Sequence, residues 1–177
     1  MSLMETMFKR KCVRSYTGEL PTEEELQLIL KVANSSPVGR AQYENMHLTV
    51  ITNPEILDKM TKNCANFFGN PAANPLYGAP MLILVSIKAP EPAMANTSYS
   101  NSASMAHNLI LAATDLGLGA VHIWGAIAAL GQAPELVAEL GLPEGFVPAC
   151  AAAIGKTEVA YEEREIPMDR VSMNVIK

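Results

Sequence analysis

The sequence has few of the side chains on which enzymes build acid–base, nucleophilic or metal chemistry. It contains three histidines among 177 residues, and their positions show no metal-ligand spacing such as His-Glu-x-x-His. No Gly-x-Ser-x-Gly nucleophile elbow is present. The aspartates are Asp58, Asp115 and Asp169. Such a shortage suits a protein in which a bound cofactor, rather than a side chain, carries the chemistry.

Cysteines and long apolar runs are also scarce. The three cysteines, Cys12, Cys64 and Cys150, are odd in number and widely spaced. This pattern suggests neither a disulfide framework nor a zinc site, and it favours a reducing cytoplasm. No apolar run reaches the ~18–20 residues of a membrane span. The longest, Ala79 to Ile87, suits a buried strand, and the N-terminus lacks a secretory signal pattern.

Positive charge is in the minority. The formal net charge of −5 argues against a nucleic-acid partner. Hydrophobic residues make up 49% and charged residues 18% of the chain, which is the composition of a globular protein. The length fits one domain over residues 1–177, and the apolar fraction is high enough to leave surface for a partner subunit.

Apolar periodicity and end signals predict helices that alternate with strands. Thr22 and Glu25 form a capping box ahead of a helix that Pro37 bounds. Residues 98–116 predict a long helix, buried in its middle and ended by Gly117. The other predictions are a helix from Met4 that breaks near Gly18, helices 53–64 and 134–140, strands 48–52, 81–87, 120–124 and 147–154, loops 34–45 and 67–78, and an arm from Lys156 onward. The expected fold is an α+β or α/β sandwich.

A tight basic cluster is the first candidate site. Lys9, Arg10, Lys11 and Arg14 are four of the 13 basic residues and lie within six positions. Arginine forks suit phosphate, so an acidic protein with one such cluster is expected to hold a small anion. The alternative is a solvated cationic turn at a helix C-terminus, which the helix dipole also favours.

Two further segments could face a ligand. Residues 36–42 form a loop shaped by Pro37 and Gly39, which could equally be an ordinary connection between a helix and a strand. Gly117 to Gly119 lead into a strand that ends at Trp124, beside Gly125. These glycines precede a strand, whereas a dinucleotide fingerprint follows one. Helix capping explains Gly117. The single tryptophan could be a core residue, and His107 is expected to be buried in the long helix.

Taken in order, several segments resemble the nitroreductase family from about Met4 to Val171. The family's Arg-(Arg or Lys)-Ser-x-Arg start corresponds to Arg10-Lys11-Cys12-Val13-Arg14. Its loop after the first capped helix corresponds to residues 36–43, and its Ala-Pro strand to Ala79-Pro80. Its Asn-Leu helix ending in Gly-Leu-Gly corresponds to residues 108–119. Its tail arginine corresponds to Arg164, shortly before Pro167.

The resemblance implies a fold, an assembly and a cofactor. The fold is a nitroreductase-like α+β sandwich, with a central, mostly antiparallel sheet flanked by helices. It forms an intertwined homodimer with FMN at the interface. Arg10 and Arg14 would bind the flavin's phosphate and ring-edge oxygens, Lys11 and Cys12 would contact it through their backbone, and Arg164 would reach the phosphate from the tail.

The remaining implied contacts lie further along the chain. Trp124 and Gly125 would place backbone N–H groups near the flavin N5, and Asn74 would hydrogen-bond the ring. The other subunit would contribute Pro37, Val38, Gly39 and Gln42. Some positions depart from the family pattern: Cys12 replaces a serine, Val38-Gly39 replace two serines, Tyr43-Glu44 replace Pro-Trp, and Glu162 replaces a cation. We therefore expect weaker FMN binding and, because residues 89–98 are brief, an open active site.

The implied activity is an FMN-dependent oxidoreductase. NAD(P)H would reduce the flavin and leave, and a nitroaromatic, quinone or similar small acceptor would then be reduced in the same cleft, with no essential protein acid or base. One alternative is a divergent family member that fragments flavin, dehalogenates aromatics or oxidises rings. Another is a flavin-binding module without turnover, and the simplest is an α+β domain whose basic cluster is only surface. Neither a membrane nor a nucleic acid is an expected partner.

Overall fold

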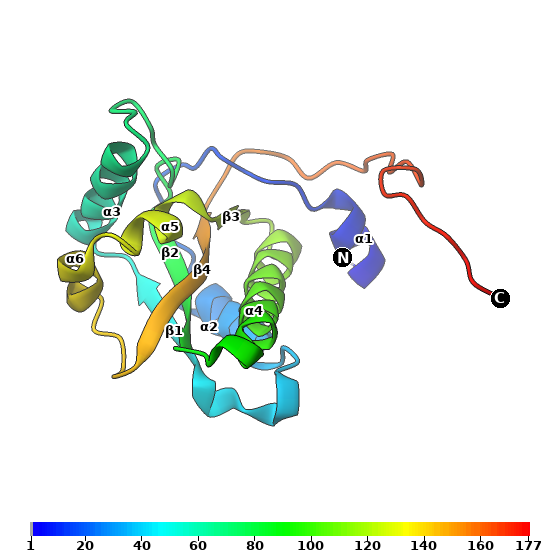
Figure 1. Cartoon of the computed structure of the whole chain (residues 1–177). Coiled ribbons are helices and arrows are strands. Elements are labelled where there is room, and N and C mark those ends of the chain that lie inside the picture. The colour runs from blue at the N-terminus through cyan, green and yellow to red at the C-terminus, as the bar shows by residue number, and fades with distance from the viewer. Residues whose placement is uncertain (1) are drawn as a thin grey trace.

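The computed structural model describes residues 2–177 and is organised around a four-stranded antiparallel sheet (Figure 1). The strand order is β1 (Met46–Ile51), β2 (Met81–Lys88), β4 (Phe146–Gly155) and β3 (Gly119–Ile123). Thus β1 and β3 are the two edges. The central strands are apolar without alternation because both of their faces are covered.

Register in the sheet is interrupted once, at a proline. The β2–β4 ladder pairs Val85 with Cys150 and then Ser86 with Pro148, so Ala149 is the extra residue of a bulge. Proline has no N–H to donate, and bulges accommodate it at low cost. All three strand pairs are antiparallel, so the expected α+β sandwich is confirmed.

Each face of the sheet carries its own hydrophobic core. Met81, Ile83 and Val85 point toward one layer, formed by α2 (Glu23–Asn34) and α4 (Ala95–Asp115). Leu82 and Leu84 point toward the other. That opposite layer consists of α3 (Pro54–Phe67), α5 (Gly125–Leu130) and α6 (Pro134–Glu139). Because side chains alternate along a strand, one apolar segment supplies both cores.

End signals in the sequence locate the helices well. The Thr22–Glu25 capping box is present in both directions, with the Thr22 N–H 2.7 Å from Glu25 Oε2 and the Glu25 N–H 3.3 Å from Thr22 Oγ1. Gly117 adopts φ 75° after α4, the left-handed conformation that glycine allows at a helix end. The middle of α4 is buried, as predicted.

Several predicted boundaries were wrong. Helix α1 is Leu3–Lys9 and ends well before Gly18, because the following residues pair with a strand edge. Helix α4 begins at Ala95 rather than Ser98. Trp124 does not end a strand: β3 ends at Ile123, and Trp124 is the N-cap of α5, a helix that the sequence analysis did not predict. The loop of residues 34–45 contains two 3-10 turns, η1 (Gly39–Ala41) and η2 (Tyr43–Asn45), and a third, η3 (Pro92–Met94), precedes α4.

Over residues 2–177, none of the helices combines the length and apolar character needed to cross a bilayer. Helix α1 and the C-terminal residues instead extend away from the body of the molecule, on the same side (Figure 1). Their apolar side chains are exposed. These are Leu3, Met4, Met7 and Phe8 in α1, and Ile166, Met168, Val171, Met173, Val175 and Ile176 in the tail.

Candidate functional site

The basic cluster lies along the free edge of β3. The Val13 N–H donates to the carbonyl oxygen of Ala120 at 3.0 Å, and the Val13 side chain is buried. The Tyr16 hydroxyl donates to the carbonyl oxygens of Val13 (3.1 Å) and Ala153 (3.3 Å), and burial raises the pKa of Tyr16, so this donor stays protonated. These bonds bring Arg10–Arg14 beside the strand that leads to Trp124.

The N-terminal segment can approach β3 closely because residue 119 is a glycine, which has no side chain. A Cβ on Gly119 would lie 2.9 Å from Val13 Cγ1 and 3.1 Å from both Thr157 Cβ and Tyr16 Cε1. Ordinary contacts between carbon atoms are about 3.5–4.0 Å. Gly119 is therefore required so that the N-terminal segment can lie on β3, a role separate from the helix capping by Gly117.

The cations of this segment are not neutralised. Among residues 2–177, no carboxylate forms an ion pair with Arg10, Lys11 or Arg14. Arg10 Nη1 reaches Cys12 Sγ at 4.0 Å, and the Arg14 guanidinium lies 5.4 Å above the centre of the Tyr77 ring. Arg10 and Lys11 are half-buried. Partly buried, unpaired cations in an acidic chain favour an anionic ligand.

The tail completes the same edge. The Tyr161 hydroxyl donates to the carbonyl oxygen of Leu118 at 2.7 Å, and Arg164 Nε donates to that of Phe8 at 2.9 Å. Burial is the main cause that raises the pKa of Tyr161. The sequence predicted that the tail is an arm that packs elsewhere in the structure. The structure places Arg164 next to the residues that lead into the basic cluster.

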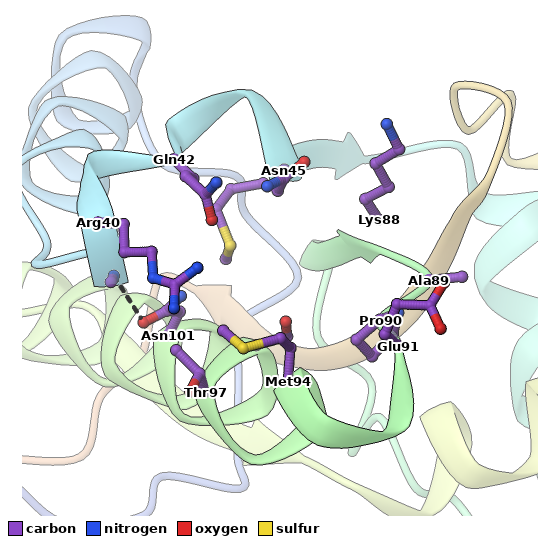
Figure 2. A pocket seen from close by; sticks show the side chains of 13 residues that line it. Arg40, Gln42, Asn45, Lys88, Ala89, Pro90, Glu91, Met94, Thr97 and Asn101 are labelled. Carbon is purple, nitrogen blue, oxygen red and sulfur yellow. Dashed lines mark hydrogen bonds between the residues drawn. The ribbon is translucent and has the colours of Figure 1, made fainter.

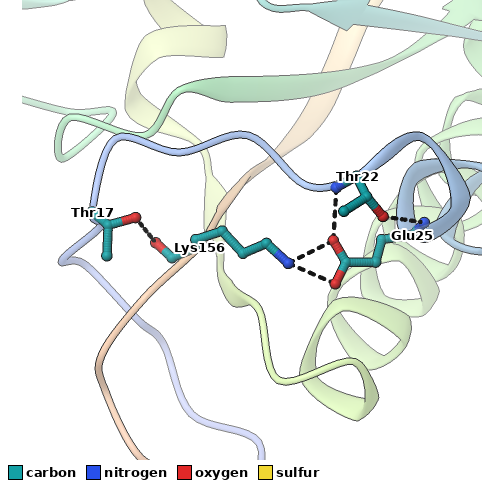
Figure 3. Close-up of polar contacts among 4 residues, drawn as sticks. All are labelled: Thr17, Thr22, Glu25 and Lys156. Atoms are coloured by element: carbon teal, nitrogen blue, oxygen red, sulfur yellow. Dashed lines mark hydrogen bonds and ion pairs between the residues drawn. The ribbon is translucent and has the colours of Figure 1, made fainter.

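The base of the tail is fixed to α2 (Figure 3). Lys156 Nζ lies 2.7 Å from both carboxylate oxygens of Glu25, whose Oε2 also accepts the Thr22 N–H. Burial acts to raise the pKa of Glu25, but the bonds from Lys156 and Thr22 outweigh it and lower the pKa overall. The backbone of Lys156 also bonds Thr17 and Glu19, so the capping box, the tail and the N-terminal segment are held together.

An aromatic column stands next to the basic cluster. The Trp124 ring stacks on His122, with centroids 6.0 Å apart and planes at 21°, and His122 stacks on His107 at 6.0 Å and 5°. Trp124 is 56% exposed, so it is not a core residue. His107 is also exposed, so its expected burial was wrong: it lies on the rim of α4, beside the edge strand.

His122 is a site residue that the sequence reading missed. Its Nδ1 is buried and has no hydrogen-bond partner within residues 2–177. Partial burial and the positive charge of Arg10 lower the pKa of His107, and burial, His107 and Arg10 lower that of His122. Strand alternation was the available signal, because residues 122 and 124 would share one side of the predicted strand 120–124.

The second predicted loop lies at the opposite edge of the sheet. It runs through η1 and η2 directly into β1, so Pro37, Gly39 and Gln42 are not brought to Arg10 within one chain. The Gly39 N–H donates to Asn101 Oδ1 at 3.1 Å, and Val38 is buried against the α2–α4 core. The buried Val38 side chain therefore anchors the loop.

A polar cavity of about 250 Å³ lies beside this loop (Figure 2). Arg40, Gln42 and Asn101 line it, and Lys88 reaches it from the end of β2. Arg40 adopts φ 59°, an uncommon conformation outside glycine. The Asn74 side chain is exposed, on the loop that also carries Tyr77 under Arg14. Within residues 2–177 there is no group of three or more His, Cys, Asp or Glu that could hold a metal ion.

Known proteins share this sequence pattern and this arrangement. The sequence profile of the Nitroreductase family matches residues 7–156. A protein of Methanothermobacter thermautotrophicus, provisionally named an NADH dehydrogenase/NAD(P)H nitroreductase, is 26% identical over 156 residues, which is 88% of this chain and 77% of that protein.

Several solved structures have a similar fold, and two of the following three carry the nitroreductase name. A nitroreductase with bound FMN from Desulfitobacterium hafniense superposes with a TM-score of 0.82 at 22% identity, covering 98% of both chains. A nitroreductase with bound FMN from Bacteroides fragilis gives 0.82 at 23% identity, covering 99% of this chain and all of that one (100%). The NADPH:FMN oxidoreductase of Vibrio harveyi, solved with NAD⁺, gives 0.77 at 21% identity over 99% of this chain and 78% of that chain. With its profile match over most of its length, the chain belongs to the nitroreductase family.

Proposed function

We propose that this protein is an FMN-dependent oxidoreductase that takes reducing equivalents from NAD(P)H. The observation that carries the proposal is the unpaired cationic segment Arg10–Arg14, held along β3 beside the exposed Trp124. The chain belongs to the nitroreductase family. Among proteins of similar fold, the D. hafniense and B. fragilis nitroreductases hold FMN, and the V. harveyi enzyme is an NADPH:FMN oxidoreductase. The simple surface-cluster alternative does not explain why these cations lie against a strand edge.

The residues present fit the chemistry of FMN. Its phosphate needs fixed cations and N–H donors, and Arg10 and Arg164 lie where the N-terminal segment meets the tail. Lys11 and Cys12 continue this segment and would present backbone groups. When bound, FMN supplies hydride transfer. Arg14 would stabilise negative charge that gathers at the ring edge on reduction, and Asn74, on the loop beneath Arg14, would hydrogen-bond the ring.

The start of α5 provides the remaining contacts. Gly125 is the first residue of this helix, and the N–H groups of a first helical turn have no intrahelical acceptor. The N–H groups of Trp124 and Gly125 would therefore be available to orient the flavin at its N5 side. The proposed reaction needs no essential protein acid or base.

We also propose that two chains assemble into an intertwined homodimer that completes the site. Residues Pro37, Val38, Gly39 and Gln42 lie at the β1 edge, whereas Arg10–Arg14 lie at the β3 edge. They can share a flavin only if they come from different chains. The exposed apolar side chains of α1 and of the tail provide surface for such a contact, since single proteins rarely expose large contiguous apolar areas.

The proposed cycle is ping-pong: NAD(P)H would donate a hydride to the flavin and leave, and a small nitroaromatic, quinone or similar acceptor would then bind in the same cleft and be reduced. All three cysteines are free thiols, which supports a reducing cytoplasm as the location. A flavin-binding module, or a divergent member with another flavin chemistry, is the second candidate. The altered loop Val38–Glu44 favours it.

The first experiment is a visible absorption spectrum of the purified protein, followed by heat release of any chromophore and comparison with authentic FMN. About one FMN per chain is expected. The Arg10→Ala variant should lose FMN, whereas Lys9→Ala, which removes an equal charge one position earlier, should retain it. Wild-type FMN occupancy in Arg10→Ala would refute the phosphate assignment. Steady NAD(P)H oxidation with a quinone or nitroaromatic would exclude the binding-module alternative.

A further inference from the structure

Two histidines stack in line with Trp124 and lie within the electrostatic reach of Arg10. Arg10 acts electrostatically on both His107 and His122, and Trp124 stacks on His122. Under the proposed function, FMN would be held by Arg10 at one end and by Trp124 at the other, and would therefore lie close to this pair. Neither histidine was assigned a role from the sequence.

Among the residues described, His122 Nδ1 lacks a hydrogen-bond partner, and a ligand could supply one. His122 Nδ1 is buried without a donor or acceptor inside residues 2–177. A buried polar group without a hydrogen bond is costly, and native proteins rarely tolerate one without reason. A ligand oxygen placed beside the ring would remove that cost if Nδ1 carries a proton.

Burial is the main cause that lowers the pKa of both imidazoles, and nearby positive charge adds to it. The charged groups that act on them are Arg10, from the N-terminal segment, and, for His122, His107 from α4. The other titratable groups nearby are Cys12, which neighbours Arg10, and Tyr161, whose hydroxyl is bonded to Leu118. Asp115 lies at the far end of α4 and accepts the Thr6 hydroxyl.

An anion bound beside Arg10 would reverse this balance, because it would offset the cationic repulsion and favour the charged imidazole. We propose that His107 and His122 are additional cofactor-binding residues, and that this pair takes up a proton when the anionic end of FMN binds beside Arg10. The inference rests on the proposed function. It makes cofactor affinity depend on pH through two side chains that lie outside the arginine cluster.

The test is a titration of the apoprotein with FMN at pH 6 and at pH 8, in which quenching of the flavin fluorescence measures binding. Calorimetry in two buffers of different ionisation enthalpy would count the protons taken up. The variants are His107→Gln, His122→Gln and the double variant, with His47→Gln as control. His47 lies on β1 at the other edge of the sheet, against Phe146. His107→Gln alters an exposed side chain, so it remains informative if His122→Gln does not fold. Riboflavin, which lacks the phosphate, is the second probe.

Averaged between pH 6 and pH 8, the wild-type protein should take up about half a proton more per FMN than the double variant. Its affinity should therefore fall about tenfold more than that of the double variant from pH 6 to pH 8. His47→Gln should behave as wild type, and riboflavin should show no histidine-dependent uptake. FMN binding with equal proton uptake in wild type and double variant would overturn this inference alone. Wild-type apoprotein that binds FMN at neither pH would overturn the proposed function, and this inference with it. Histidine-dependent proton uptake with riboflavin would show that the pair does not respond to the phosphate, and would overturn the inference.

Discussion

Gly119→Ala tests whether the contact between the N-terminal segment and β3 builds the cofactor site. The added methyl group would lie 2.9 Å from Val13 Cγ1 and 3.1 Å from Tyr16 Cε1 and Thr157 Cβ. Val13 is buried and valine has few allowed rotamers, so the backbone of the segment must move. Overpacking of this kind costs about 1–3 kcal/mol. For a chain of this length it corresponds to a fall in Tm of about 2–12 °C.

The effect on FMN should be larger than the loss of stability implies. Moving Val13 off Ala120 also moves Arg10 and Arg14. Loss of one charge-assisted hydrogen bond, worth about 1.5–3 kcal/mol, would raise the FMN dissociation constant about 10- to 150-fold. The assay is FMN titration of the apoprotein, with Tm measured on the same samples by circular dichroism.

Gly117→Ala is the matched control. It adds the same methyl group two residues earlier, where no atom lies within 4 Å, but at φ 75°. The left-handed conformation should cost about 1–2 kcal/mol, with FMN affinity unchanged. Wild-type FMN affinity in Gly119→Ala, or an equal loss of affinity in Gly117→Ala, would refute the reasoning.

Two other changes probe the same edge. Cys12→Ser replaces a weak sulfur acceptor, 4.0 Å from Arg10 Nη1, by a hydroxyl. FMN binding should become about 2- to 10-fold tighter, which is the contribution of one neutral hydrogen bond. Cys12→Ala should give no gain, so equal FMN affinity of the two variants would contradict this prediction. Glu25→Gln should lower Tm at pH 7, because the ion pair with Lys156 is lost. The pKa of Glu25 is lowered in the folded protein, so its contribution is present above the ordinary value of 4.5 and is lost as pH falls through the folded pKa. The Tm difference from wild type should therefore shrink below about pH 4.5, whereas Glu23→Gln, which affects only an exposed bond to Gln27, should show no such trend.

Local signals in the sequence predicted much of the fold. The Thr22–Glu25 capping box, the apolar run of β2 and the glycine after α4 each act within a few residues. Their outcome is therefore set by neighbouring side chains and backbone sterics. Helix α5 escaped prediction because its six residues, Gly125–Leu130, are apolar all round. In so short a segment, helical and strand periodicities cannot be told apart.

By itself, the sequence determined the family pattern, the two central apolar strands and the clustering of cations at Arg10–Arg14. Only the tertiary structure decided that this cluster lies on β3, that His107 and His122 stack beneath Trp124, and that the Pro37–Gln42 loop lies at the opposite edge. The physical reason is the separation along the sequence of the residues that make each contact. Helix and strand patterns arise from contacts a few residues apart, whereas the site depends on one backbone hydrogen bond between Val13 and Ala120 and on the space left by Gly119.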